Sequence, residues 1–329
     1  MRKVLGMGNA LTDMLLTMEN EKVLQQLNLQ RGGMHLVNID EIDLLHSYVD
    51  FSKAVKAAGG SAANTAYGVS KLGGKASFFG KIAQDDIGNF FLQDMLKNLV
   101  KPYLIVDEHQ TSGSSNILVS EDGERTMCTY LGVSGDLKAK DLSPELFQEH
   151  DIFHVEGYLV QNHELIRTAV KMAKEAGCMV SIDLASFNVV EEHLEFLQSI
   201  TKDYVDIVFA NEEEAFAFTQ KHAYDAAEAI AQMADIAIVK MGSKGSIVQQ
   251  GNQNFLIQAY TANCIDTTGA GDLYAAGFLY GLSINLPLQV CGEIGSWVAS
   301  QVVEVIGAKM PDERWEHIKN HVQTIIANS

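Results

Sequence analysis

The residue types best suited to chemistry lie in one short stretch, Asp-Thr-Thr-Gly-Ala-Gly-Asp, which occupies positions 266–272. Gly269, Ala270 and Gly271 form a turn of small residues, and apolar residues at helical spacing follow it. The first N–H groups of a helix have no partner inside the helix and lie at the positive end of its dipole, so they can bind an anion. Asp272 falls in the first helical turn, where a carboxylate beside a phosphoryl group could act as a base.

The alternative is a plain glycine turn in which Asp272 only caps the helix. The order of the residues is more specific than that, because it resembles the second signature of the ribokinase-like (PfkB) carbohydrate and nucleoside kinases, Asp-Thr-x-Gly-Ala-Gly-Asp. The resemblance implies that Asp272 activates the acceptor hydroxyl and that the amides of residues 269–272 hold the developing phosphate charge. It also places Thr267 among the residues that bind the nucleotide.

A second motif is a glycine pair, Gly59 and Gly60, that leads into a helix of small residues. Small residues let a ligand or another backbone approach closely. Asn64 lies one turn into this helix, although Asn prefers helix caps to helix interiors. Close helix packing with Asn64 bonded to backbone is one explanation. The other is the resemblance of Gly-Gly-x-x-x-Asn-x-Ala to the first signature of the same family, which lines the sugar site.

The first strand of the chain is expected at residues 4–11 and ends in polar residues. Asn9 and Asp13 lie at its carboxyl end, and ligands bind at the carboxyl ends of strands in open α/β sheets. Asp13 could also be a simple turn residue. The pattern Gly-Asn-x-x-x-Asp resembles the opening of the family, in which the Asp binds sugar hydroxyls. A dinucleotide site at Gly6 and Gly8 is disfavoured, because the third glycine is missing and no clear helix follows.

Two further motifs point to a nucleotide. Asn211 and Glu214 resemble the family's Asn-x-x-Glu, which organises Mg²⁺ through water; a helix start rich in acids is the alternative. Lys240, Gly242 and Gly245 resemble the Thr-x-Gly-x-x-Gly nucleotide turn, with Lys240 at the position of the Thr; a simple hairpin is the alternative.

The pattern from residue 151 onward predicts strands alternating with helices. Strands are expected at 152–156, 179–184, 207–211 and 236–240, and this alternation is typical of a parallel sheet covered on both faces. Glu156, Asp183 and Asn211 stop three of these strands and should line the ligand edge of the sheet.

Smaller features complete the prediction. Residues 116–131 are expected to form a hairpin with Asp122-Gly123 in the turn. Arg125 is expected to be an exposed cross-strand charge, and the alternative is that it reaches the active site. Asp85 is expected to cap a helix at residues 89–99. Helices are also expected at residues 191–199 and at 297–308, the second ending at Gly307.

The composition excludes several classes of protein. The chain has 329 residues, 47% of them hydrophobic, and a net charge of −18, which disfavours nucleic acid and anionic membranes as partners. No apolar run is long enough to span a membrane, and the N-terminus is interpreted as a first strand. Four scattered cysteines favour reduced thiols and a cytoplasmic location.

The resemblance covers nearly the whole chain and implies a ribokinase-like α/β fold: a central, mainly parallel sheet flanked by helices on both faces, with a small β lid. The expected core comprises residues 1–11, 39–111 and 132–329, and the expected lid comprises 12–38 and 112–131. A homodimer through the exposed lid sheet is compatible with this fold.

The implied activity is ATP-dependent phosphorylation of a hydroxymethyl group on a sugar or nucleoside, with Mg²⁺ and, at the segment around Asp266, a monovalent cation such as K⁺. Three stretches resemble adenosine kinase-like members, although Thr268 stands where adenosine kinases often carry Asn. Ribose, fructose and other nucleosides stay open as acceptors. A sugar- or nucleotide-sensing protein without catalysis is the alternative function.

Overall fold

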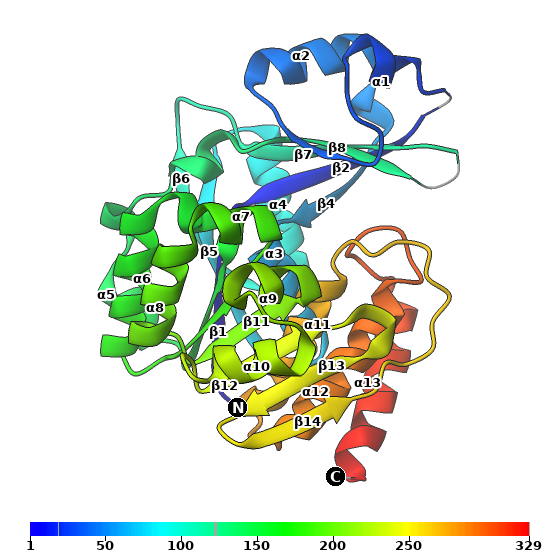
Figure 1. The fold of residues 1–329 in the computed structure, drawn as a ribbon. Coiled ribbons are helices and arrows are strands. Elements are labelled where there is room, and N and C mark those ends of the chain that lie inside the picture. The colour runs from blue at the N-terminus through cyan, green and yellow to red at the C-terminus, as the bar shows by residue number, and fades with distance from the viewer. Residues whose placement is uncertain (19, 122–123, 329) are drawn as a thin grey trace.

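The computed structural model describes residues 1–18, 20–121 and 124–328. Its larger part is built on a nine-stranded sheet in the order β14-β13-β12-β11-β10-β9-β1-β5-β6 (Figure 1). The strands are β1 (Lys3–Met7), β5 (Lys75–Ala83), β6 (Lys101–Asp107), β9 (Ile152–Glu156), β10 (Met179–Asp183), β11 (Ile207–Asn211), β12 (Ile236–Lys240), β13 (Ser246–Gln250) and β14 (Gln253–Ile257). Neighbouring strands are parallel from β6 to β12, whereas β13 and β14 are antiparallel to their neighbours.

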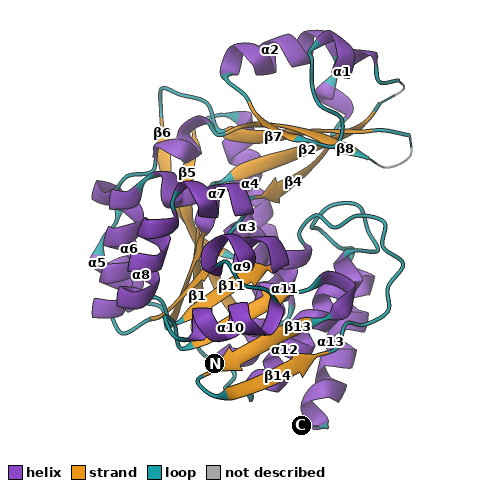
Figure 2. Ribbon diagram, in the orientation of Figure 1, coloured by secondary structure: helices purple, strands orange, loops and turns teal. Residues whose placement is uncertain are grey.

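Helices cover both faces of this sheet because its strands are apolar on both sides (Figure 2). In β11, Ile207 and Phe209 lie in one core and Val208 and Ala210 in the other. The first core is closed by α3 (Ser61–Lys71), α4 (Asp86–Lys97), α11 (Ala270–Ser283), α12 (Leu288–Val302) and α13 (Asp312–Ala327). The second is closed by α5 (Pro144–Gln148), α6 (His163–Glu175), α7 (Phe187–Glu192), α8 (Leu194–Tyr204), α9 (Glu212–Thr219) and α10 (Ala223–Ala231). The predicted fold class is confirmed.

A smaller sheet of five strands lies across the carboxyl ends of the parallel strands (Figure 1). Its order is β3-β8-β7-β2-β4, with β2 (Leu11–Thr17), β3 (Met34–Leu36), β4 (Val55–Gly59), β7 (Gly113–Val119) and β8 (Arg125–Tyr130). The helices α1 (Lys22–Gln26) and α2 (Ile39–Tyr48) pack on its outer face around Met14, Leu45 and Leu118. No helix in the described part of the chain is both long and apolar enough to cross a membrane.

The smaller sheet takes in more of the chain than the sequence prediction gave it. Residues of β4 and α2 were expected in the core, but β4 pairs antiparallel with β2, and α2 packs against Met14 and Leu118 of the smaller sheet. Strand β4 belongs to this sheet because it leads directly into the glycine pair that starts α3. The motif that begins at Gly59 therefore starts on the smaller sheet. The antiparallel pair β7–β8 is confirmed as the predicted hairpin, and Asp122 and Gly123 lie outside the described residues.

Two predicted helices have different bounds in the structure. Helix α12 begins at Leu288 and ends at Val302, so Gly307 lies five residues beyond its last helical residue rather than at its end. The carbonyl of Val303 accepts hydrogen bonds from the Ile265 and Asp266 amides, which draws the chain out of the helix. The helix expected at residues 191–199 is two helices, α7 and α8, that meet at His193. Asp85 caps α4 as predicted, accepting from the Gly88 amide at 2.7 Å, although α4 spans Asp86–Lys97 rather than residues 89–99.

Close packing of α11 against two neighbours fixes where its N-terminus lies. A Cβ atom on Gly68 in α3 would lie 2.5 Å from the Cβ of Ala276 in α11. A Cβ atom on Gly277 would lie 2.8 Å from the Cα of Gly295 in α12 and 2.9 Å from the carbonyl oxygen of Ile294. The helix backbones therefore touch, and this contact sets the depth of α11 in the core.

Gly277→Ala should destabilise the protein, because the new methyl group meets backbone atoms that cannot rotate aside. We expect the upper end of the usual overpacking range, about 3 kcal/mol, less the roughly 1 kcal/mol that Ala gains over Gly in a helix, so a net loss of about 2 kcal/mol. Urea unfolding measures it. Gln323→Ala, on the exposed face of α13, is the control and should stay within about 0.5 kcal/mol. Equal stability of Gly277→Ala and the parent would contradict this description of the packing.

Candidate active site

The turn before α11 has the geometry of an anion site. Gly269 precedes the helix with φ +77°, a conformation that favours glycine, and a Cβ atom there would lie 2.6 Å from the Cβ of Ala308. The Ala270 amide donates to the carbonyl of Thr267 at 3.1 Å. Within the described part of the chain, the amides of Gly269, Gly271 and Asp272 have no hydrogen-bond acceptor. These amides can therefore bind an anion.

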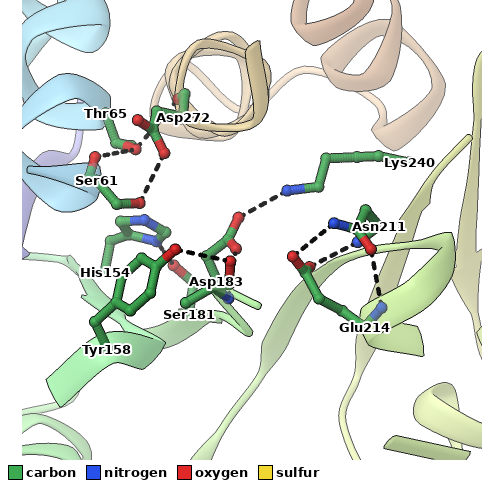
Figure 3. Close-up of polar contacts among 11 residues, drawn as sticks. Ser61, Thr65, His154, Tyr158, Ser181, Asp183, Asn211, Glu214, Lys240 and Asp272 are labelled. Carbon is green, nitrogen blue, oxygen red and sulfur yellow. Dashed lines mark hydrogen bonds and ion pairs between the residues drawn. The ribbon is translucent and has the colours of Figure 1, made fainter. Parts of the chain in front are cut away.

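Asp272 is held by the start of α3. Its Oδ1 accepts from the Ser61 hydroxyl at 2.7 Å and its Oδ2 accepts from the side-chain amide of Asn64 at 3.0 Å. The Thr65 hydroxyl donates to its backbone carbonyl at 3.2 Å, and Figure 3 shows Asp272 with Ser61 and Thr65. Burial raises the pKa of Asp272, and the two side-chain hydrogen bonds partly counter this rise. A carboxylate with a raised pKa is a better base than an ordinary aspartate.

The residues predicted to bind a sugar gather close to Asp272. The carboxylate of Asp13 lies over Gly59, where a Cβ atom would be 2.3 Å from Asp13 Oδ1. Gly60 has φ +94°, and a Cβ atom on it would lie 2.2 Å from the carbonyl oxygen of Asn9. Burial raises the pKa of Asp13 to about 7, a rise that Lys309 opposes and Asp272 adds to. Gly59 is therefore required for the Asp13 carboxylate to come this close, and Gly60 is required for the backbone of Asn9 to do so.

Asn64 and Asn9, which were predicted to bind the substrate, also contact acids of the protein. The amide of Asn64 donates to Asp272, so it orients the candidate base, and its buried Oδ1 has no hydrogen-bond partner among the described residues. Both the backbone and the side-chain amide of Asn9 donate to Glu156 Oε1, each at 2.8 Å. The backbone amide of Ala62 donates to Glu156 Oε2 at 3.0 Å. Glu156 thus joins the end of β1 to the start of α3.

Glu156→Gln should loosen this junction. Burial raises the pKa of Glu156 to about 7 although three N–H groups donate to it, and the NH₂ group of a glutamine would face one of those donors. An unsatisfied buried donor costs about 1–3 kcal/mol, so the free energy of unfolding should fall by that amount, as measured in urea. Glu164→Gln makes the same change at an exposed position on α6 and should be neutral. A neutral Glu156→Gln would contradict this role.

The candidate magnesium residues form a closed pair at the start of α9. Asn211 caps the helix, and its backbone and side-chain amides donate to the two carboxylate oxygens of Glu214 at 2.8 and 2.7 Å. Glu214 is 3% exposed, and burial, together with the nearby Asp183, raises its pKa to about 7. The described residues contain no cluster of three or more His, Cys, Asp or Glu able to hold a metal ion. The pair therefore fits a water-mediated contact to Mg²⁺ better than direct coordination.

Lys240 ends β12 and does not point into the turn that follows it. Its Nζ lies 2.8 Å from Asp183 Oδ2, and Figure 3 shows it reaching toward Asp183 near the Asn211–Glu214 pair. The turn itself carries the predicted glycines. Gly242 has φ +56° and Gly245 φ +94°, and a Cβ atom on Gly245 would lie 1.9 Å from the Ile257 carbonyl oxygen. Thr267 is exposed.

Arg125 was predicted to be an exposed charge, and this prediction is wrong. Its side chain is 7% exposed, with a guanidinium nitrogen 2.8 Å from Asp266 Oδ2 and another 3.1 Å from the Thr268 hydroxyl. Strand β8 turns this side chain toward the core, where the carboxylate of Asp266 neutralises it. Asp183 was predicted only to line the ligand edge of the sheet, and Ser61 was not predicted as a site residue at all. The polar end of β10 was the only signal for Asp183, and Ser61 had none beyond its place in a helix start.

Taken together, the fold and the site define a kinase: an α/β core with an anion-binding turn, a buried carboxylate beside it and polar strand ends facing a smaller sheet. The family model of the pfkB family carbohydrate kinases matches residues 36–315. The chain therefore belongs to the pfkB family of carbohydrate kinases, and it is a phosphotransferase whose acceptor is an alcohol group on a sugar or nucleoside. Kinases of this family use ATP and Mg²⁺.

Individual relatives differ in the substrate that their names give. A probable sugar kinase from Rhizobium etli is 33% identical, with a TM-score of 0.88 over 97% of this chain and 98% of its own. Adenosine kinase from Sinorhizobium meliloti is also 33% identical, with a TM-score of 0.87 over 97% and 99%. A probable fructokinase from Arabidopsis thaliana is 31% identical over 69% of this chain and 74% of its own length.

Proposed function

We propose that this protein transfers the γ-phosphoryl group of ATP to a hydroxymethyl group of a nucleoside or sugar, with Asp272 as the general base. The observation that carries this proposal is the contact of Asp272 with Ser61 and Asn64 beside the free amides of the α11 turn. A protein that only senses a ligand has no need for a buried carboxylate with a raised pKa next to an anion site.

The mechanism follows from where these groups lie. Asp13 orients the acceptor by accepting hydrogen bonds from its hydroxyl groups, and Asp272 accepts the proton of the reacting hydroxyl. The hydroxyl oxygen bonds to the γ-phosphorus as the bond from that phosphorus to the bridging oxygen of ADP breaks. Negative charge on the transferred group is stabilised by the amides of Gly269 and Gly271. Ser61 and Asn64 keep the Asp272 carboxylate in place throughout.

The nucleotide would lie on the side of Asn211, Gly242, Gly245 and Thr267. Bound Mg²⁺ would neutralise charge on the phosphates, and Asn211 and Glu214 would hold it through water. A monovalent cation fits the side chain of Asp266 poorly, because its Oδ1 already accepts hydrogen bonds from Thr268, and its Oδ2 accepts from the Gly307 amide and is paired with Arg125. We therefore derive no step through K⁺.

We favour a nucleoside of the adenosine type as the acceptor. The support is the 33% identity to an adenosine kinase whose structure covers 97% of this chain, together with the three stretches that resemble adenosine kinase-like members. Release of ADP from Mg-ATP with adenosine, inosine, ribose and fructose as acceptors tests this choice. Turnover with a sugar and not with a nucleoside would overturn it. A thermal shift with ATP but no turnover with any acceptor would favour the sensor.

Asp272→Asn should abolish the reaction and leave binding intact. The amide is isosteric but cannot take a proton, and general bases contribute roughly 10²–10⁴-fold, so kcat should fall by at least that factor. The affinities for ATP and acceptor, measured by calorimetry, should change little. Asp203→Asn on the exposed side of α8 is the matched control. An Asp272→Asn variant with a near-parental kcat would remove Asp272 as the base.

We further propose that the smaller sheet acts as a lid, that it can support a homodimer and that the protein is cytoplasmic. Strands β3 and β4 are the open edges of the sheet, and Met34, Leu36 and Val55 expose 50%, 58% and 71% of their surface there. Unpaired strand edges with apolar residues favour association with a second copy. Light scattering on the purified protein measures the mass, and a monomer at all concentrations would exclude the dimer.

The four cysteines are unpaired, as expected for a reducing compartment.

A further inference from the structure

Lys240 is a buried cation in the middle of the candidate site. Its side chain is 15% exposed and that of its partner Asp183 is 8% exposed. The parallel register explains this position: β11 and β12 pair Asn211 with Lys240, so Lys240 emerges at the carboxyl end of the sheet beside the candidate magnesium residues. An ammonium group is rarely buried without a reason, since removing it from water is costly even when it is paired.

The Lys240 ammonium lies directly next to the anion-binding turn. A Cβ atom built on Gly271 would be 3.1 Å from Lys240 Nζ, and it would have no other described atom within 4 Å beyond its own helix and chain neighbours. The space in front of Gly271 is therefore bordered by the free amides of the α11 turn and by this ammonium. Both carry positive potential, and they approach the same space from two different elements, α11 and β12.

The charges around Lys240 keep it protonated. Burial works against the charged form, but the attraction of Asp183 and Glu214 and the hydrogen bond to Asp183 outweigh it and raise the pKa of Lys240. The surroundings are otherwise acidic, because the carboxylates of Asp183, Glu214 and Asp272 all act on this group. Without the ammonium, a polyphosphate entering this space would meet a strongly negative field.

We propose that Lys240 is a catalytic residue whose ammonium binds the phosphoryl group during its transfer from ATP, and that Asp183 is the positioning residue that aims it. The proposal rests on the kinase reaction proposed above and assigns one further group to it. As the acceptor oxygen bonds to the γ-phosphorus and the bond to ADP breaks, Lys240 stabilises the negative charge on the equatorial oxygens. Its own proton stays on Nζ, and the hydroxyl proton goes to Asp272.

A purely structural role is the competing explanation, in which Lys240 only neutralises the buried Asp183. The two roles separate in a double variant. Lys240→Met alone leaves Asp183 buried and unpaired, so it should lower the melting temperature whatever the role of Lys240. Adding Asp183→Asn removes the second charge and should restore most of the melting temperature. A structural Lys240 then predicts that activity returns with stability, whereas a catalytic Lys240 predicts that activity stays lost.

The experiment measures melting temperature, kcat and both KM values for the parent, Lys240→Met, Asp183→Asn and Lys240→Met/Asp183→Asn. Loss of one charge-stabilising donor typically lowers kcat by about 10²–10³-fold, and we expect that loss in both variants lacking Lys240, with the KM for the acceptor within about threefold. Asp183→Asn alone should lower kcat by a smaller factor and leave the acceptor KM unchanged. A double variant with a kcat within about tenfold of the parent would overturn the proposal.

Nucleotide binding distinguishes a failure of this proposal from a failure of the kinase assignment. Calorimetry with ATP and with AMP should show that Lys240→Met/Asp183→Asn weakens ATP binding and leaves AMP binding unchanged, because AMP has no group to reach Lys240. Equal loss for both nucleotides would overturn the contact. If the parent binds ATP without turning over any acceptor, the kinase assignment fails for those acceptors while the binding comparison still decides the contact. A parent that binds no ATP would overturn both.

Discussion

The site depends on one contact, the pair of hydrogen bonds that Ser61 and Asn64 donate to Asp272. They join the first turns of two helices that lie more than two hundred residues apart in the sequence. Glycines allow the contact, because Gly68 lets α3 pack against Ala276 of α11. Tight packing of this kind tolerates little change in volume, so the position of the carboxylate is fixed by the core itself. Catalysis and packing therefore share the same residues here.

The second constraint is electrostatic. Asp13, Glu156 and Glu214 are acids whose pKa burial raises to about 7, and Asp272 is shifted in the same direction. Such a concentration of acids at one edge of the sheet suits a site that transfers the proton of a hydroxyl group. A few buried cations balance the negative charge of these acids. The overall charge of −18 does not prevent the binding of a polyphosphate, because local amides and cations act at short range and distant surface charges are screened.

The sequence supported the main outlines of this site for physical reasons. Alternating strands and helices, and the glycine-rich starts of α3 and α11, follow from local patterns, and these predicted the parallel sheet and the glycine turn that precedes Asp272. Contacts between distant segments could not be predicted. Arg125 sits on a hairpin strand, and alternation along a strand does not say which face will meet another layer. The same is true of Lys240, whose motif indicated the turn that follows it rather than the space beside Gly271.

The ion pair between Arg125 and Asp266 has a mechanical consequence. Arg125 belongs to β8 of the smaller sheet, and Asp266 also accepts hydrogen bonds from Thr268 and Gly307, which flank the turn before α11 on two sides. One carboxylate thus ties a strand of the outer sheet to the loop that shapes the anion site. A displacement of that strand must either break this buried ion pair or move the loop with the strand. The position of the anion-binding turn before α11 is therefore coupled to the position of the smaller sheet.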